Sequence, residues 1–229
     1  MLGLILAENG FSAFLDWFAP FADIVPIILE GFWVTLEVII VGFFFGFILG
    51  AIAGLARLSN NKVIYGIVTV YVETIRGTPI LIQILFIFFG LPILGITFGS
   101  LTAAFIAIAF NSAAYIAEIV RGAVYSIDKG QTEAGRSIGL SHSQTMRYVI
   151  WPQAIKRMIP PMGNQFIISL KDSSLLAVIA LGEIVYQGRE YIAVTYNVGQ
   201  TYIVIAIAYL VITIPFSLIL RRVERRMDV

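Results

Sequence analysis

Long apolar runs separated by short polar segments make up the chain from residue 31 onward. A helix needs about 20 apolar residues to cross a bilayer, and five stretches approach this length. Their expected positions are Gly31–Ala56, Gly66–Phe89, Leu101–Val120, Ile159–Leu181 and Gly199–Leu220. The pattern therefore predicts an all-α integral membrane protein with five transmembrane helices, and a short turn at residues 91–95 between the second and the third.

The composition agrees with a membrane protein. Of the 229 residues, 59% are hydrophobic and 13% are charged, whereas soluble domains average about 45–50% apolar and about 25% charged residues. The absence of cysteine excludes disulfides, thiolate metal sites and a cysteine nucleophile. A single histidine, His142, cannot form a histidine metal cluster, so we expect no metal site. The net charge of +1 gives no indication of nucleic-acid binding.

The lysines and arginines indicate how the chain is oriented in the membrane. Most of them fall on one side of the predicted spans: Arg57, Lys62, Arg121, Lys129, Arg136, Arg147, Lys156, Arg157, Arg221, Arg222, Arg225 and Arg226. Cytoplasmic connections carry the excess of positive charge in membrane proteins. The polar segment after the third span and the C-terminus are therefore expected in the cytoplasm, and the N-terminus outside.

Residues 1–30 show a pattern of their own. Apolar residues recur at helical spacing, and three acidic residues follow one another every seven positions. We expect an external segment that lies along the membrane interface and is bent at Pro20 and Pro26, with a simple anchoring role favoured. The start of the chain has no basic leader, so no processing is expected. The predicted domains are this N-terminal segment and a transmembrane domain over residues 31–229.

The most polar stretch of the chain is Asp128–Pro152, called here the polar loop. Thr132 is expected to begin a helix that ends before Gly139, where a glycine suits a left-handed C-terminal cap. Ser141 and Gln144 have the spacing of a capping box, and the helix that they open is predicted to run to the end of the loop.

The first of these two helices has a smooth patch. Ala134 and Gly135 are small, so we expect that a partner's surface can approach the helix closely at this point. Glu133 and Arg136 flank the patch at a spacing that allows them to pair. The sequence therefore favours a docking role for the polar loop.

Two other interpretations of the polar loop are weaker. A DNA-binding helix-turn-helix needs a recognition helix that can reach a groove, whereas this loop is tethered between two spans and carries few cations. A solvated loop without any partner is the second alternative, although two capped helices are more structure than such a loop requires.

The polar loop resembles the cytoplasmic loop of ABC importer permeases. The family pattern is Glu-Ala-Ala, three residues, Gly, nine residues and Ile-x-Leu-Pro, and this chain has Glu133-Ala134-Gly135, Gly139 and Val149-Ile150-Trp151-Pro152 at the same spacing. It departs from the pattern at Gly135, Val149 and Trp151. Other segments are similar to the polar amino-acid subfamily, above all to bacterial glutamine permeases: Glu73–Pro79, Asn111–Glu118, Pro160–Gln165, Leu170–Leu175 and Leu220–Arg226. The resemblance covers nearly the whole chain from Gly31 onward.

The resemblance implies a type I ABC importer permease fold in a multi-pass subunit of the bacterial inner membrane. A cytoplasmic ABC ATPase dimer would bind the coupling helix, an external amino-acid-binding protein would deliver the substrate, and a second permease subunit would complete the path. The residues expected to couple to the ATPase are Thr132, Glu133, Ala134, Gly135, Arg136 and Gly139. No lysine stands in a phosphate-binding loop. We therefore expect no enzyme activity and no cofactor in this chain, with ATP and Mg held by the ATPase.

Polar residues inside the predicted spans are the candidates for substrate contact, because ionisable groups in a membrane are costly and mostly functional. A free amino acid carries an ammonium and a carboxylate, so its site needs both signs of charge and neutral hydrogen-bonding groups. The candidate residues are Glu73, Arg76, Asn111, Gln165, Lys171, Asp172, Ser173 and Ser174. Arg76 or Lys171 would hold the carboxylate, and Asp172 with its serine neighbours is the preferred contact.

A purely structural role is the alternative for these charges, since neighbouring charges can neutralise each other between packed helices. The pairs concerned are Glu73 with Arg76, Lys171 with Asp172 and, as the favoured interpretation, Glu118 with Arg121. On the first span, Gly42, Gly46 and Gly50 follow one another every four residues. This spacing predicts close packing against another helix rather than chemistry.

These observations favour the permease subunit of an ATP-driven importer that moves a polar L-amino acid by alternating access. Glutamine is favoured, and arginine, histidine and glutamate also fit. The alternative is an ion-coupled secondary amino-acid transporter, which the polar loop and the lack of an internal repeat disfavour. The sequence leaves open whether the second permease is identical or homologous, whether the permease has its own substrate pocket, and whether the binding protein is soluble or tethered.

Overall fold

The computed structural model describes the backbone of residues 2–227 and the side chains of Trp17 and residues 19–227. Every regular element in this part of the chain is helical. The long helices are α1 (Leu2–Ala56), α2 (Lys62–Arg76), α4 (Ser100–Tyr125), α7 (Trp151–Asp172) and α9 (Val198–Arg226). The shorter α-helices are α3 (Ile80–Leu85), α5 (Lys129–Ser137), α6 (His142–Thr145) and α8 (Ile184–Thr195). Single π or 3-10 turns extend α3, α6 and α7 at Phe86–Leu94, Met146–Ile150 and Ser173–Ile179.

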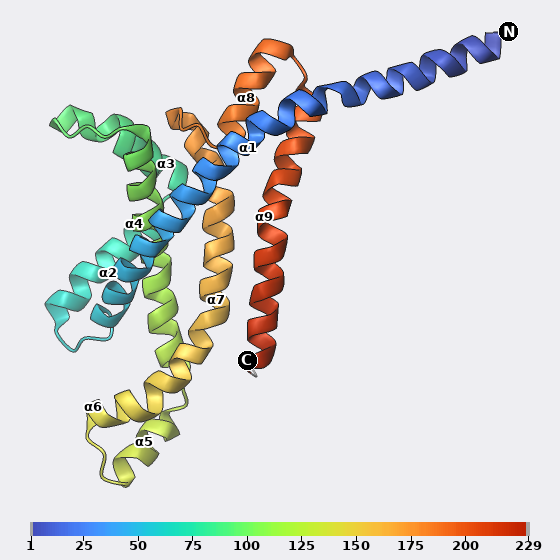
Figure 1. Cartoon of the computed structure of the whole chain (residues 1–229). Coiled ribbons are helices and arrows are strands. Elements are labelled where there is room, and N and C mark those ends of the chain that lie inside the picture. The colour runs from blue at the N-terminus through green and yellow to red at the C-terminus, as the bar shows by residue number, and fades with distance from the viewer. Residues whose placement is uncertain (1, 228–229) are drawn as a thin grey trace.

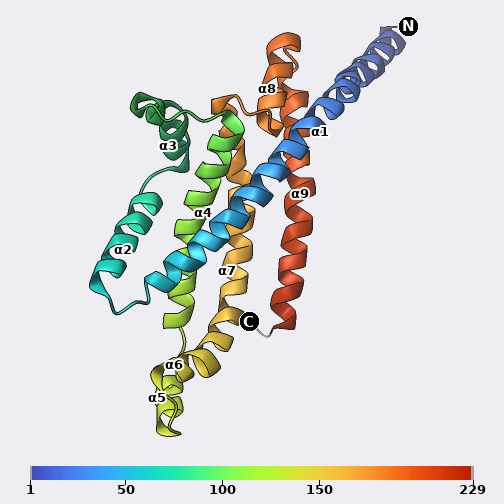
Figure 2. The ribbon, with the colours of Figure 1, turned by 60° about the vertical axis from the view of Figure 1, so that its left-hand side comes forward.

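The helices form a bundle crossed diagonally by α1 (Figure 1). Helix α1 contacts α4, α7 and α9 in turn, and α4 packs against α7. The polar loop with α5 and α6 extends from one end of the bundle, and α8 lies at the other end (Figures 1 and 2). We call these two ends the loop end and the α8 end. The end of α9 points toward the loop end, whereas the start of α1 points toward the α8 end (Figure 1).

Glycines on α1 allow its close approach to α4, as their spacing predicts. A Cβ atom at Gly46 would lie 2.9 Å from the carbonyl oxygen of Ala109, and one at Gly50 would lie 2.7 Å from Cβ of Ile116. Gly42 faces Ile108 in the same way, at 2.9 Å. Small residues at a helix interface let two backbones come together, and van der Waals packing then holds helices in lipid. The predicted close-packing face is confirmed.

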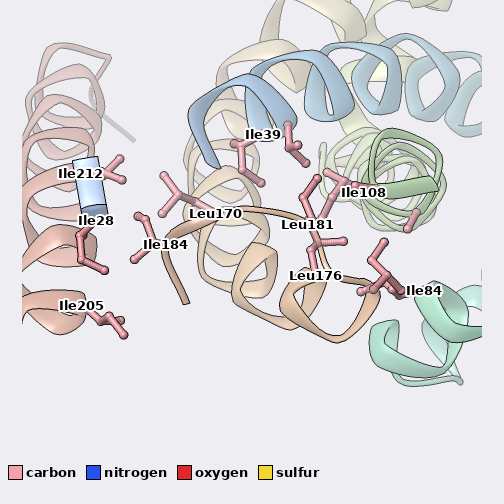
Figure 3. Close-up of a cluster of buried hydrophobic side chains, with 14 of the residues drawn as sticks. Ile28, Ile39, Ile84, Ile108, Leu170, Leu176, Leu181, Ile184, Ile205 and Ile212 are labelled. Carbon is pink, nitrogen blue, oxygen red and sulfur yellow. The ribbon is translucent and has the colours of Figure 1, made fainter. Parts of the chain in front are cut away.

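A central hydrophobic cluster joins the helices toward the α8 end (Figure 3). Ile39 of α1, Ile108 of α4 and Leu170 of α7 are among its fully buried members. Leu176 and Ile184 add the segment that follows α7 and the start of α8. This cluster is the main apolar core that holds the bundle together.

The second predicted span is not a straight helix. Helices α2 and α3 meet at an angle of 104° across the break at residues 77–79. Pro79 disfavours a helical conformation for the residue before it, which is one reason why the chain turns here. Hydropathy does not distinguish a straight span from a bent one, and the predicted second span contains this turn.

The apolar helices only partly match the five predicted spans. Within residues 19–227, three helical segments are long and apolar enough to cross a membrane: Ala19–Ala56, Ser100–Tyr125 and Val198–Arg226. The bent pair α2–α3 would make a fourth. The fourth predicted span lies on α7, whose α-helical part ends at Asp172, nine residues before the predicted end at Leu181. Helix α8 was not predicted, because twelve residues are too few for a spanning helix.

The N-terminal helix crosses the predicted domain boundary without interruption. Helix α1 continues from Leu2 to Ala56 and includes both Pro20 and Pro26. The backbone is therefore helical on both sides of residue 30. The helix has no break at the predicted boundary between the N-terminal segment and the transmembrane domain. The side chains of the acidic and apolar pattern before residue 17 lie outside the described residues.

The polar loop has the two helices that its sequence predicts, with different limits. Asp128 caps α5 by accepting a hydrogen bond from the backbone N–H of Gly130 at 2.7 Å, so α5 begins at Lys129 rather than at Thr132. Gly139 has the predicted left-handed backbone, with φ of +89°, and Ser141 forms the capping box with Gln144. The second helix does not end at Pro152. Its turns continue directly into α7, which begins at Trp151. Pro152 is tolerated there because the first turn of a helix does not use the backbone N–H that proline lacks.

Candidate functional site

A polar cavity of about 460 Å³ lies between the α2–α3 break, α4 and α7. Its volume falls within the range of about 300–1,000 Å³ that is usual for small-molecule sites. The lining residues are Arg76, Gly77, Thr78, Pro79, Ile80, Asn111, Tyr115, Gln165, Ile168 and Asp172. The cavity thus combines one arginine, one carboxylate and two amides.

Gln83 of α3 holds the wall that the α2–α3 break contributes. Its amide nitrogen donates to the carbonyl oxygens of Ile75 at 2.8 Å and Thr78 at 3.1 Å. Its amide oxygen accepts from Nδ2 of Asn111 at 3.0 Å. The carbonyls freed by the break are therefore satisfied within the protein, and one side chain ties the break to α4. Gln83 is a glutamine within the apolar run Ile80–Phe89, which is the sequence signal for this role, although it carries no charge and belongs to no quoted motif.

The opposite wall is tied together by buried polar side chains of α4 and α7. The hydroxyls of Ser112 and Ser169 lie 3.1 Å apart, and Nε2 of Gln165 donates to the Ser169 hydroxyl at 3.3 Å. Asn111 and Gln165 are each about 95% buried. Because both amides are held by neighbours, they present fixed donors and acceptors to the cavity.

The eight predicted substrate residues do not all meet in this cavity. Arg76, Asn111, Gln165 and Asp172 line it. The other four lie outside its lining: Glu73, Lys171, Ser173 and Ser174. The two serine hydroxyls donate to the carbonyl oxygens of Leu170 and Lys171, each at 2.7 Å, and Lys171 is exposed. The cavity also includes Tyr115 and the break itself, neither of which was among the eight.

The charges near the loop end pair mostly between different segments, with one pair inside α4. Glu73 approaches Arg57 at 3.4 Å, and Arg76 approaches Glu118 at 3.8 Å. No Glu73–Arg76 or Lys171–Asp172 ion pair is found among the described residues; Glu73 and Arg76 are paired with charges of other segments instead. The pairing of Glu118 with Arg121 is confirmed. Arg57 directly follows the first apolar run, so the sequence predicts that it lies in a cytoplasmic connection. The structure shows it paired with Glu73 and Glu118.

The outer surface of α5 differs from the prediction in one respect. Glu133, Ala134 and Arg136 are exposed, as is Ile138, with 79% of its surface accessible. Gly135, however, is buried against α6, where a Cβ atom would lie 2.8 Å from Cγ2 of Thr145. The expectation that Gly135 lowers the outer surface for a partner was therefore wrong. Its small size serves the contact between α5 and α6.

A second polar site holds the α8 end together around Glu183, which lies outside the membrane-spanning segments. Its carboxylate is fully buried and accepts from the backbone N–H of Tyr186 at 2.7 Å and from the hydroxyl of Tyr209 at 3.1 Å. Burial raises the pKa of this carboxyl from 4.5 to about 7. Gly31 of α1 packs directly on the Glu183 backbone, where a Cβ atom would come within 2.7 Å. The connection to α8 is thus fixed to both α1 and α9.

No group of three or more histidine, cysteine, aspartate or glutamate side chains that could hold a metal is found within the described part of the chain. The site is therefore built from an arginine, a carboxylate, amides and backbone. Such groups can bind a polar organic molecule and orient it by hydrogen bonds.

Comparison with known proteins gives relatives of matching length. The chain is 46% identical over 216 residues to the glutamine transport system permease protein of Escherichia coli strain K12, a match that covers 93% of this chain and 98% of the relative. It is 35% identical to the arginine transport system permease protein of Bacillus subtilis strain 168, over 93% of this chain and 97% of the relative. A chain from the crystal structure of an amino acid ABC transporter with histidines is 40% identical. It superposes with a TM-score of 0.88, over 91% of this chain and 98% of that chain.

The family assignment rests on the fold and the sequence together. Residues 42–229 match the family described as the binding-protein-dependent transport system inner membrane component. The helical architecture, the polar loop between α4 and α7 and the superposition agree with a type I ABC importer permease. Members of this family work with a separate ATPase and a substrate-binding protein, so the chain is a transport subunit and not an enzyme. The protein belongs to the family of inner-membrane permease subunits of binding-protein-dependent ABC transporters.

Proposed function

We propose that the chain is the permease subunit of an ATP-driven importer for a polar L-amino acid, with glutamine the favoured substrate. The observation that carries this proposal is the cavity between the α2–α3 break, α4 and α7, which presents Arg76 and Asp172 together with two amides. An amino acid is a zwitterion and needs both charges compensated when it leaves water. The similarity to glutamine and arginine permeases supports this substrate class.

Each part of a bound glutamine has a matching group in the cavity. Arg76 receives the carboxylate, because guanidinium and carboxylate form strong charge-assisted hydrogen bonds. Asp172 receives the ammonium. Asn111 and Gln165 have fixed amides and bind the amide of the substrate side chain. Glu73, Lys171, Ser173 and Ser174 make no direct contact in this arrangement, since none of them lines the cavity.

The loop end faces the cytoplasm and the α8 end faces the outside in this proposal. The excess of lysine and arginine near the loop end supports this orientation. The first 30 residues then lie outside, along the membrane interface, ahead of a transmembrane domain over residues 31–229. The binding protein delivers substrate at the α8 end, where Glu183 fixes α8 against α1 and α9.

The exposed side of the polar loop receives the ATPase dimer, which holds ATP and Mg. Thr132, Glu133, Ala134 and Arg136 supply the contact surface, and Ile138 adds an apolar side chain at its tip. Gly135 and Gly139 act through shape, by close packing on Thr145 and by the left-handed turn. ATPase closure moves this loop as a rigid body with the helices attached to it, which gives alternating access.

A second permease subunit, identical or homologous, completes the path. One observation supports this: the centre of the bundle is filled by hydrophobic side chains, and the polar cavity lies at its side. If the substrate path runs between two such subunits, the second subunit closes the open side of the cavity. The alternative, an ion-coupled secondary transporter, has no comparable support, because the family depends on a binding protein and an ATPase.

Equilibrium binding tests the proposed site. The detergent-purified permease–ATPase complex is titrated, without binding protein, with L-glutamine, L-arginine, L-histidine and L-glutamate. We expect binding of L-glutamine that weakens at least tenfold in Arg76→Gln and Asp172→Asn, whereas the exposed neighbour Lys171→Gln binds like wild type. If none of the four amino acids binds to the wild-type complex, a substrate site in this cavity is contradicted. It is also contradicted if all three variants bind L-glutamine with the same Kd.

A further inference from the structure

Five charged side chains meet where the ends of α1 and α2 approach α4, between the cavity and the loop end. At the centre is Glu118 of α4, whose Oε2 lies 2.6 Å from Nη1 of Arg57 and 3.8 Å from Nη1 of Arg76. Arg121 binds the same carboxylate, with Nε at 3.0 Å. Glu73 completes the cluster at 3.4 Å from Arg57. One carboxylate therefore holds arginines from three different parts of the chain.

The three arginines are held with unequal strength. The Arg57 side chain is 6% exposed and, like Arg121, makes a short contact with Glu118, whereas Arg76 is 35% exposed and makes the longest. Arg76 is also the member of the cluster that lines the cavity. Three arginines against two glutamates leave one positive charge uncompensated within the cluster. Arg76 is thus the arginine that can bind another carboxylate at the least cost.

We propose that Glu118 is a positioning residue that releases Arg76 to the carboxylate of a bound amino acid, so that cavity occupancy is transmitted to the polar loop. This inference rests on the proposed function of the cavity. In the empty site Glu118 holds Arg76. When substrate binds, its carboxylate takes over Arg76, while Arg57 and Arg121 keep Glu118 in place and charged.

The surrounding packing allows such an exchange to move α2 relative to α4. Val72 is the fully buried side chain of α2, so polar contacts contribute much of the attachment of this helix to α4. They include the Arg76 guanidinium over the Tyr115 ring, 5.5 Å from its centroid. A helix with so few buried side chains can shift when one of its ion pairs changes partner.

The other side of Glu118 is connected to the polar loop. A second hydrophobic cluster around Ile116, Val120 and Ile127 joins this end of α4 to Ile150, near the end of the polar loop, and to Met158 of α7. A change in the pairing of Glu118 therefore acts on a packed unit that continues into α5 and α6. Two sites are coupled when an element between them has two arrangements and each site shifts the equilibrium between these arrangements. The packed unit around this end of α4 lies between the cavity and the polar loop and is proposed as that element.

The test uses the complete permease–ATPase complex and two readouts, the Kd for L-glutamine and the stimulation of ATP hydrolysis by L-glutamine in the presence of the binding protein. Glu118→Gln frees Arg76 from competition, so we expect a Kd about two- to fivefold lower, the range for a partly exposed ion pair. We expect that stimulation is lost. The matched control is Glu37→Gln, an exposed glutamate of α1 outside the cluster, which should change neither readout.

A second variant guards against misfolding, because Glu118→Gln leaves the buried Arg57 with Glu73, at 3.4 Å, as its remaining carboxylate, and Nε of Arg57 already has no partner. Arg57→Gln/Glu118→Gln removes the buried charge together with its counter-ion and should reproduce the tighter Kd and the lost stimulation. Wild-type Kd and stimulation in both Glu118 variants would overturn the proposal, as would weaker binding in both. If wild type itself binds no amino acid, the proposed function of the cavity fails instead.

Discussion

Gly135 of α5 lies directly against Thr145 of α6, where a Cβ atom at position 135 would come 2.8 Å from Cγ2 and 3.1 Å from Oγ1 of the threonine. The family pattern has alanine at this position. In this chain Thr145 fills the space that the alanine methyl would need, so we expect Gly135→Ala to separate α5 from α6. Overpacking of this kind costs about 1–3 kcal/mol.

The measurement is copurification of the ATPase with the permease, together with ATP-dependent uptake in proteoliposomes. Gly135→Ala should lower both, and Gly135→Ala/Thr145→Ala should restore them, because the nearest remaining atom is then Cβ of Thr145, at 3.5 Å. Normal coupling in the single variant would show that the contact between α5 and α6 does not set the position of the loop.

The contact between α1 and α4 gives a prediction about stability. A Cβ atom at Gly50 would lie 2.7 Å from Cβ of Ile116, so Gly50→Ala should destabilise the protein by about 1–3 kcal/mol. Gly66 of α2 has no atom within 4 Å of its Cβ position and serves as the control. Gly66→Ala should be neutral or stabilise by about 0.5–1 kcal/mol, since alanine favours helix. Thermal unfolding in detergent compares the two, and equal melting temperatures would argue against the close α1–α4 contact.

The buried carboxyl of Glu183 predicts a pH dependence of stability. Its folded pKa is about 7 and its ordinary value is 4.5. Between these values the unfolded chain is ionised while the folded chain remains protonated, so the stability of the wild type falls as pH rises from about 4.5 to 7 and then stays level. Glu183→Gln keeps both hydrogen bonds and does not titrate. Relative to wild type it should therefore gain about 2.5 kcal/mol between pH 5 and pH 8.

Thermal unfolding of the purified complex at pH 5 and pH 8 measures this gain. Glu190→Gln, an exposed position on the same helix, is the control and should show no gain. A constant difference between Glu183→Gln and wild type at both pH values would mean that Glu183 is ionised in the folded protein.

Gln83 gives a prediction that connects stability to substrate binding. Gln83→Leu removes the donor to the carbonyls of Ile75 and Thr78 and leaves Asn111 without its acceptor. Buried polar groups without partners cost about 1–3 kcal/mol each. We expect lower thermal stability and weaker L-glutamine binding. Gln153→Leu, in the first turn of α7, should leave the Kd unchanged. Wild-type affinity in Gln83→Leu would show that the break does not shape the cavity.

The sequence was informative where one local rule decides the structure. Glycines spaced by four, the left-handed Gly139 and the capping box at Ser141 each depend on a few neighbouring residues, and all three are confirmed. The family motifs identified the fold class and the polar loop. Polar residues inside the predicted spans supplied the eight candidates for substrate contact, and four of them line one cavity.

The sequence was uninformative where distant segments meet. Glu118 is matched by Arg57, 61 positions away, and no local spacing indicates that pairing. The direction of the chain after Gly77 depends on packing against α4 and on Gln83, whereas hydropathy is the same for a straight and a bent span. Glu183 attracted no notice because it lies between predicted spans, although it is buried between α8, α1 and α9.

Competition binding to the purified complex tests the central claim, that the cavity recognises both charges of an amino acid. The ligands are L-glutamine, its α-carboxamide analogue without the carboxylate, and glutaramate without the ammonium. We predict that wild type prefers glutamine to both analogues. Arg76→Gln should lose the preference for glutamine over the carboxamide and keep the preference over glutaramate. Asp172→Asn should lose the preference over glutaramate and keep the preference over the carboxamide. Unchanged preferences in both variants would contradict the account.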